Sequence, residues 1–121
     1  MYIKCLTNNP MVYQKNYPNT LFIVGDIKEL LLAVKIEIEN GRRLITHPLT
    51  SSIRPDISPY KTVLLSNKKN GVDFESMNII INAIEYTTDL MNNQTKDVNW
   101  DERSLLDFQF IDLDIIKNVM P

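Results

Sequence analysis

The residues best suited to chemistry lie in one polar segment that contains the chain's only histidine. Two prolines, Pro48 and Pro55, keep this segment out of a helix or a central strand, so its side chains are expected at an exposed turn. His47 can donate or accept a hydrogen bond near neutral pH, and Arg54 offers a planar fork for a carboxylate or phosphate. The predicted ligand contacts here are Thr46, His47, Ser51, Ser52 and Arg54.

A second polar cluster ends the first apolar segment of the chain. Thr7, Asn8 and Asn9 stand before Pro10, and their hydroxyl and amide groups suit a ligand's amino or carboxyl groups. Tyr60 could close such a site with its ring and hydroxyl. These four residues complete the predicted set of ligand contacts: Thr7, Asn8, Asn9 and Tyr60.

Each candidate also has a structural interpretation. His47 could bond a nearby carbonyl, Arg54 could pair with Asp56, and the two asparagines could serve only to form a turn. Tyr60 could be a core aromatic residue with an exposed hydroxyl. The sequence leaves both interpretations open.

Strands and helices that alternate along the chain must position these residues. The pattern predicts strands over 2–6, 21–24, 43–46 and 62–65, the second of them buried and central. Helical spacing of apolar residues predicts helices over 27–40, after the capping residue Asp26, and over 74–92, after Asp73. The tail is expected to form a short edge strand over 108–113 and then a short helix.

This alternation predicts an α/β fold: a single small three-layer domain over residues 1–121, with 93–121 as a C-terminal extension. The sheet is expected to have four to five strands, mostly parallel and possibly mixed, with flanking helices. In such sheets ligands collect beyond the carboxyl ends of the strands. If the first and third strands are neighbours, the Thr7 and His47 clusters face each other across one crevice.

Composition excludes several classes of protein. A net charge of −2 and a pI near 5.3 give no basic footprint for nucleic acid. The N-terminus lacks the apolar core of a signal peptide and no apolar run reaches membrane length, so we expect a cytoplasmic protein that does not bind membranes. One cysteine and one histidine predict neither a disulfide nor a structural metal site. Without a glycine-rich phosphate loop or nucleophile elbow, no cofactor and no catalytic residues are predicted.

Several motifs together resemble those of a known family. Thr7 to Pro10, Leu44 to Leu49, Ser52 to Pro55 and Pro59 to Lys61, in this order and spacing, are similar to the small GrdX-type proteins. These proteins are encoded beside the glycine, sarcosine and betaine reductase components of amino-acid-fermenting anaerobes. The resemblance runs from about residue 5 to residue 86. It implies an accessory role in reductive amino-acid metabolism, with no catalytic residues to carry over.

Three hypotheses of function follow. The first is a module that binds a small anionic ligand, such as an amino-acid-like carboxylate or a phosphate, at the predicted contacts. The second is an interaction protein, a homodimer or an assembly aid for a reductase component, which makes contact through apolar residues of the tail. The third is an enzyme that uses His47 as acid or base, or pairs it with Cys5 as a nucleophile. The sequence favours binding over catalysis. The tail residues of the second hypothesis are Trp100, Leu105, Leu106, Phe108 and Phe110.

Overall fold

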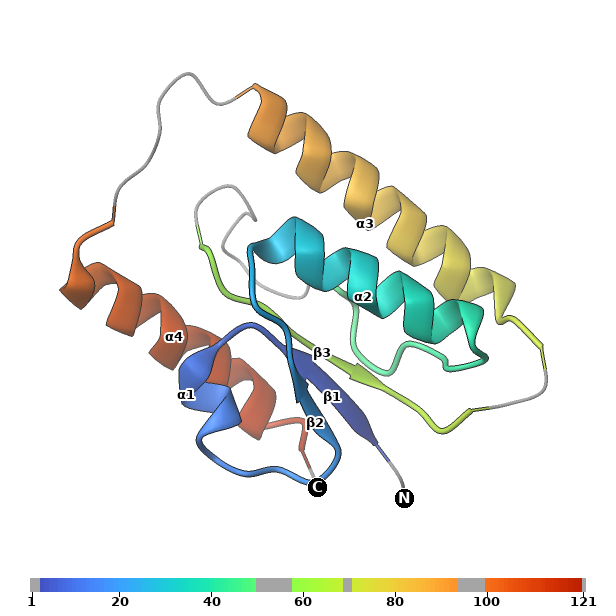
Figure 1. The fold of residues 1–121 in the computed structure, drawn as a ribbon, viewed down its shortest axis with the longest axis horizontal. Helices are drawn as coiled ribbons and strands as arrows, with labels where there is room; N and C mark the ends of the chain where they lie inside the picture. The colour runs from blue at the N-terminus through green and yellow to red at the C-terminus, as the bar shows by residue number, and fades with distance from the viewer. Residues whose placement is uncertain (1–2, 50–57, 69–70, 94–99, 121) are drawn as a thin grey trace.

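A computed structural model describes residues 3–49, 58–68, 71–93 and 100–120. In the described residues a three-stranded sheet has helices on both faces (Figure 1). The strands are β1 (Lys4–Thr7), β2 (Thr20–Phe22) and β3 (Thr62–Leu65). The helices are α1 (Pro10–Tyr13), α2 (Ile27–Glu39), α3 (Phe74–Asn92) and α4 (Glu102–Lys117).

The sheet is mixed, with the strand order β2-β1-β3. β1 pairs parallel to β2 and antiparallel to β3, so the expected four to five mostly parallel strands are not found in the described residues. The connection from β1 to β2 contains the short helix α1, in place of the long helix of a typical crossover.

The predicted strand over 43–46 is reduced to one bridge, between Leu44 and Leu65. It runs antiparallel to β3, and therefore parallel to β1. Its ladder ends early because the side-chain hydroxyl of Thr46 accepts the hydrogen bond from the Leu64 amide, 3.0 Å away. β3 thus lies between β1 and this segment, so the first and third predicted strands are not neighbours.

β2 is an edge strand, and the prediction of a buried central strand over 21–24 was wrong. Leu21 is 43% exposed and Val24, beyond the end of β2, is 82% exposed. The central place belongs to β1, whose Cys5 and Leu6 are fully buried. A short apolar run does not by itself distinguish an edge from a centre, because both favour β-branched and aromatic residues.

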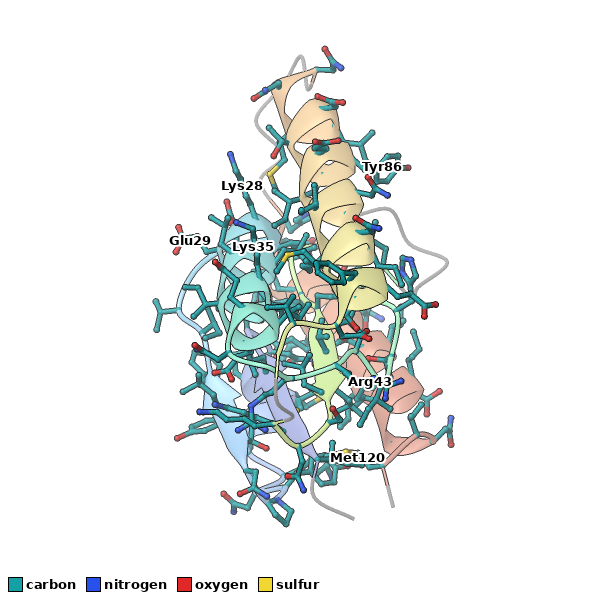
Figure 2. All side chains as sticks on the ribbon, turned by 90° about the vertical axis from the view of Figure 1, so that its right-hand side faces the viewer. Lys28, Glu29, Lys35, Arg43, Tyr86 and Met120 are labelled. Atoms are coloured by element: carbon teal, nitrogen blue, oxygen red, sulfur yellow. The ribbon has the colours of Figure 1, made fainter. Side chains whose placement is uncertain are left out.

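α2 and α3 begin at the caps that the sequence predicts. The Asp26 carboxylate accepts a hydrogen bond from the Glu29 amide at 3.0 Å, and Asp73 accepts one from the Ser76 amide at 3.1 Å. α2 stops at Asn40, before Gly41 with φ +100°, a value that favours glycine. In Figure 2 the labelled side chains of α2 point away from the sheet: Lys28, Glu29 and Lys35.

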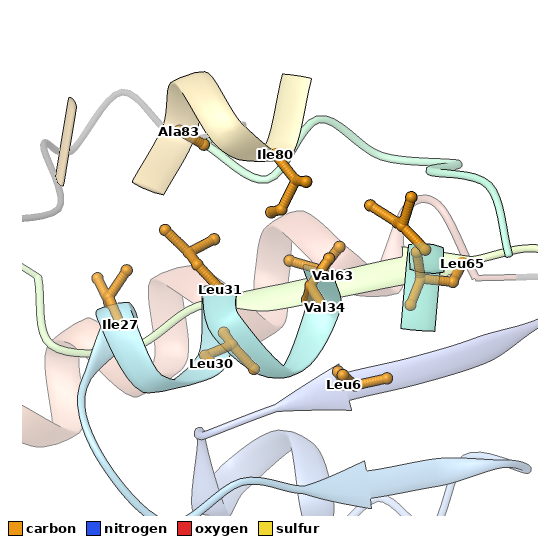
Figure 3. Packing of buried hydrophobic residues seen from close by; sticks show 10 residues of the cluster. Leu6, Ile27, Leu30, Leu31, Val34, Val63, Leu65, Ile80 and Ala83 are labelled. Atoms are coloured by element: carbon orange, nitrogen blue, oxygen red, sulfur yellow. The ribbon is translucent and has the colours of Figure 1, made fainter. Parts of the chain in front are cut away.

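The larger core lies between the sheet, α2 and α3 (Figure 3). Leu6, Val63 and Leu65 project from the strands toward α2, and Ile80 and Ala83 approach from α3. The remaining members come from α2, which packs between the sheet and α3. They are Ile27, Leu30, Leu31, Val34 and Ile38.

The tail forms one long helix, α4, so the expected edge strand over 108–113 was wrong. Asp101 caps the helix by accepting a hydrogen bond from the Ser104 amide at 2.7 Å. Leu113 and Ile116, three residues apart, are the buried positions. The alternation of Phe108, Gln109 and Phe110 resembles a strand only locally, because packing at helical spacing over sixteen residues prevails.

Side chains alternate across β1 and so divide between two cores. Leu6 faces α2, whereas Cys5 belongs to a smaller cluster on the opposite face, with Leu64, Leu113 and Ile116. Thr7, two residues after Cys5, shares the face of the sheet that α4 covers. This alternation places the polar end of β1 against α4.

Candidate functional site

A chain of hydroxyl and carboxylate groups crosses from the sheet to α4. The side-chain oxygens of Thr7 and Thr62, which are paired residues of β1 and β3, lie 2.8 Å apart. The Thr62 hydroxyl donates to Asp112 Oδ2 of α4 at 2.7 Å. Thr7 and Thr62 are both buried. The edge of the sheet is therefore linked directly to the C-terminal helix.

Asn9 makes a second link to α4. Its Nδ2 donates to Asp112 Oδ2 and to the Gln109 carbonyl, each at 2.9 Å, while its Oδ1 accepts from the Met11 amide at the start of α1. Asn9 is fully buried. Both the Nδ2 and the Oδ1 of Asn9 are hydrogen-bonded within the protein. Asn9 therefore positions the site and does not face solvent.

Asn8 ties the end of β1 to the chain that enters β3. Its Oδ1 accepts from the Lys61 amide at 2.8 Å, and its Nδ2 donates to the carbonyls of Pro59 and Gly25 at 2.9 and 3.2 Å. Three segments far apart in sequence meet at this one amide. Asn8 thus fixes the backbone on which Lys61 stands.

Tyr60 also contacts α4. The Gln109 amide, Nε2, donates to the Tyr60 hydroxyl at 3.0 Å. The ring is partly exposed, in keeping with an aromatic residue whose tip is polar. Tyr60 therefore lies at the border between the buried hydrogen bonds and solvent.

Lys61 stands at this edge with its side chain buried, at 4% exposure. Within the described residues its ammonium group has no hydrogen bond and no salt bridge. Burial lowers the pKa of Lys61, and the negative charge of Asp112 offsets only part of that effect. The site thus holds a partly desolvated cation that is not bonded to a counter-ion among the described residues.

Asp112 lies in the same region and is partly buried. Burial raises the pKa of its carboxyl group, while the hydrogen bonds from Asn9 and Thr62 and the charge of Lys61 lower it in part. Neither Lys61 nor Asp112 forms a salt bridge with the other. Two opposite, partly desolvated charges thus lie in one region without a direct bond, which is typical of functional sites as well as of structural networks.

The segment that contains His47 lies on the far side of β3 from Asn8. Thr46 contacts Leu64 through its hydroxyl, and His47 follows it toward the Thr62 end of β3. The exposed imidazole accepts a hydrogen bond from the Leu49 amide through Nδ1 at 3.1 Å. The predicted contacts Ser51, Ser52 and Arg54 lie outside the described residues.

Cys5 is not an activated nucleophile. It is fully buried, and burial raises the pKa of its thiol to about 11, so the thiol stays protonated at neutral pH. Its neighbours in the smaller core are apolar side chains from α1, β3 and α4. The cysteine acts here as a small apolar core residue.

The described residues include no group of three or more histidine, cysteine, aspartate or glutamate side chains arranged to hold a metal ion. Nor does any helix in them combine the length and apolar character needed to cross a bilayer.

Comparison with known protein families shows to which family the chain belongs. The model of the GrdX-like protein family matches residues 4–121. The chain belongs to the GrdX-like protein family. The match includes α4, so the C-terminal helix of this GrdX-like protein is part of the family's common sequence. Neither a curated protein nor a solved structure matches the chain.

Sequence reasoning missed the two charged residues at the centre of the site. Lys61 directly precedes the apolar run of β3, which is an unusual place for an unpaired charge. Asp112 falls on the same helical stripe as Leu113 and Ile116, and that position would have marked it as inward-facing had the tail been recognised as a helix. Both signals were present in the sequence of the GrdX-like protein.

Proposed function

We propose that this GrdX-like protein binds a small anionic ligand, a carboxylate or a phosphate, with Lys61 as its cationic anchor. The supporting observation is Lys61, whose side chain is only 4% exposed and whose ammonium group has no bonded partner among the described residues. A largely desolvated charge is costly unless it is paired, so a lysine held here without a bonded partner favours a partner from outside the chain.

Arg42 offers a comparison, because it is a buried cation that is paired within the chain. At 7% exposure it is nearly as buried as Lys61, yet its Nε donates to Glu37 Oε2 at 2.9 Å. Lys4 contacts the other oxygen of Glu37 at 2.7 Å. The difference between Arg42 and Lys61 supports a ligand-binding role for the lysine.

The position of Lys61 agrees with the edge at which ligands collect in α/β proteins. β1 and β2 end there, and α2 begins there after Gly25. In this proposal Thr7, Asn8 and Asn9 hold the edge in place, and Tyr60 and His47 border it. Ser51, Ser52 and Arg54 stay predicted contacts from the neighbouring segment.

The biological setting is also a proposal. The resemblance to proteins encoded beside glycine, sarcosine and betaine reductase components supports an accessory role in cytoplasmic amino-acid reduction. An amino-acid-like carboxylate is the ligand that fits this setting best. Inorganic phosphate is the alternative that fits the same cation.

A thermal-shift panel tests the proposal. Inorganic phosphate, acetate, glycine and a set of amino acids and nucleotides are added to the wild type, Lys61→Met and Lys68→Met. A ligand at about 100 times its Kd adds about 2.7 kcal/mol of stability. At least one probe should raise the Tm of the wild type and of Lys68→Met, whose lysine is exposed, but not of Lys61→Met. No shift with any probe, or an equal shift in all three proteins, contradicts the proposal.

A homodimer is a second candidate, favoured by the outer surface of α4. Leu106 and Phe110, one helical turn apart, are 50% and 58% exposed. Large exposed apolar side chains that are neighbours favour an interface. Sedimentation of the wild type and of a Leu106→Ser, Phe110→Ser double variant tests it: the wild type should dimerise and the variant should be monomeric. A monomeric wild type excludes the homodimer.

A further inference from the structure

The carboxylate of Asp112 occupies a position that resembles a bound ligand. Its Oδ2 accepts from two side-chain donors of the sheet edge, Asn9 Nδ2 at 2.9 Å and the Thr62 hydroxyl at 2.7 Å. An amide and a hydroxyl that converge on one oxygen are an ordinary way to bind a carboxylate. Asp112 comes from α4, whereas both donors belong to the first 62 residues of the chain.

The attachment of α4 to the rest of the molecule has two parts. The apolar part consists of Leu113 and Ile116, which pack with Cys5 and Leu64 of the sheet. The polar part consists of Asp112 together with Gln109, which is bonded through its carbonyl to Asn9 and through its amide to Tyr60. The hydrogen bonds of Asp112 and Gln109 described above all go to residues at the sheet edge that carries Lys61.

We propose that Asp112 is a built-in competitor for the ligand: the acidic group of the ligand takes its place beside Lys61, and α4 is released as it binds. This inference rests on the proposed anion site and specifies its regulation. An anion near Lys61 would be repelled by Asp112 while α4 stays docked. The ligand therefore has a higher affinity for the state in which α4 has moved away, and it shifts the population toward that state.

The charges in this region support competition. Besides Lys61, which attracts Asp112, no lysine or arginine among the described residues bonds to the Asp112 carboxylate. Its burial is unfavourable to the charged form. A carboxylate that is held by two neutral donors at a desolvation cost is easier to displace than one held in a direct salt bridge.

Release of α4 would have a visible consequence on the face of the sheet. Cys5 and Leu64, now covered by Leu113 and Ile116, would become accessible together. Ligand binding at one edge of the sheet would thus control the exposure of an apolar surface beside it. This is a two-state element of the kind that couples binding to a change of surface.

Hydrogen exchange of the wild-type protein with and without inorganic phosphate or glycine, whichever shifts the Tm, provides the test. The amides of α4 should exchange about fivefold faster or more at saturating probe, the lower end of ordinary coupling between two sites. The amides of α2 and α3 should not exchange faster. Unchanged or slower exchange of α4 at saturating probe overturns the inference and leaves the proposed anion site intact.

Two matched variants add an independent measurement. Asp112→Asn removes the competing charge and keeps the side-chain shape, so it should bind the same probe about fivefold tighter or more. Asp114→Asn removes an equal charge from the exposed side of α4, where Asp114 pairs with Lys117, and should leave the affinity unchanged. Equal affinities of the two variants overturn the inference. If neither the wild type nor Asp112→Asn binds any probe, the proposed function fails first and this inference fails with it.

Discussion

Asp112 of α4 and Thr62 of β3 share a hydrogen bond of 2.7 Å, although fifty residues separate them. The bond matters because it brings an acidic side chain of the last helix to the sheet edge that carries Lys61. Lys61 is buried and Asp112 is partly buried, and among the described residues neither is bonded to a counter-ion. The energetics of this region should therefore depend on pH and on added anions.

Replacing Asp112 with asparagine should stabilise the protein near neutral pH. The folded-state pKa of Asp112 is raised above its ordinary value of 3.8 because the carboxyl group is buried. A carboxyl group whose pKa is higher in the folded than in the unfolded state stabilises the fold at low pH, where it is protonated. This contribution to the free energy of unfolding is lost as the pH rises through the folded-state pKa. Asparagine has no such loss, so Asp112→Asn should unfold at a higher Tm than the wild type at pH 7 and at a similar Tm near pH 3.

Urea denaturation at pH 3, 5 and 7 measures this difference as a free energy of unfolding. Asp114→Asn is the control, because its carboxylate is half exposed and paired with Lys117 at 2.8 Å. A difference between Asp112→Asn and the wild type that stays constant from pH 3 to pH 7 would contradict the assignment.

Truncation of Asn9 should be costly. Asn9→Ala removes the cap of α1 and leaves the Gln109 carbonyl and the Asp112 carboxylate short of a donor. The loss of a cap and of buried hydrogen bonds predicts a decrease in unfolding free energy of about 2–4 kcal/mol. Asn82→Ala, at an exposed position of α3, should change stability little or raise it slightly. Equal effects of the two substitutions would argue against the network.

Two leucines of α4 should differ in their contribution to stability. Leu113 is buried against the sheet and Leu106 is 50% exposed. Leu113→Ala should cost about 2–5 kcal/mol through lost burial and a cavity. Leu106→Ala should stay within about 0.5 kcal/mol of the wild type. Chemical denaturation of both variants decides whether α4 is docked as described, and similar costs would contradict the packing.

The helices near the middle of the chain were predictable because their signals are local. Asp26 and Asp73 cap α2 and α3 as the spacing of polar and apolar residues predicts. α4 was mistaken in part for a strand because the six residues 108–113 alternate in character; Asp101, whose carboxylate caps the helix, was not among the predicted caps. The edge position of β2 depends on which strands pair, and pairing is a long-range property that a short apolar run does not encode.

The candidate site was predictable only in its location. The polar turn that begins with Asn8 does lie at the sheet edge, but the amides of Asn8 and Asn9 bond other parts of the chain. The proposed roles of Lys61 and Asp112 rest on desolvation and on contacts across 50 to 103 positions of sequence, which composition and periodicity do not reveal.

The most direct measurement is the pKa of Lys61 itself, followed by NMR of ¹³C-labelled lysine side chains. In the free protein the account predicts a pKa below the ordinary 10.5, and a rise as inorganic phosphate or glycine saturates the site. The exposed Lys68 serves as the internal reference. A Lys61 pKa at or above 10.5 in the free protein, or one that no anion changes, would contradict the claim that Lys61 is desolvated and binds an anionic ligand.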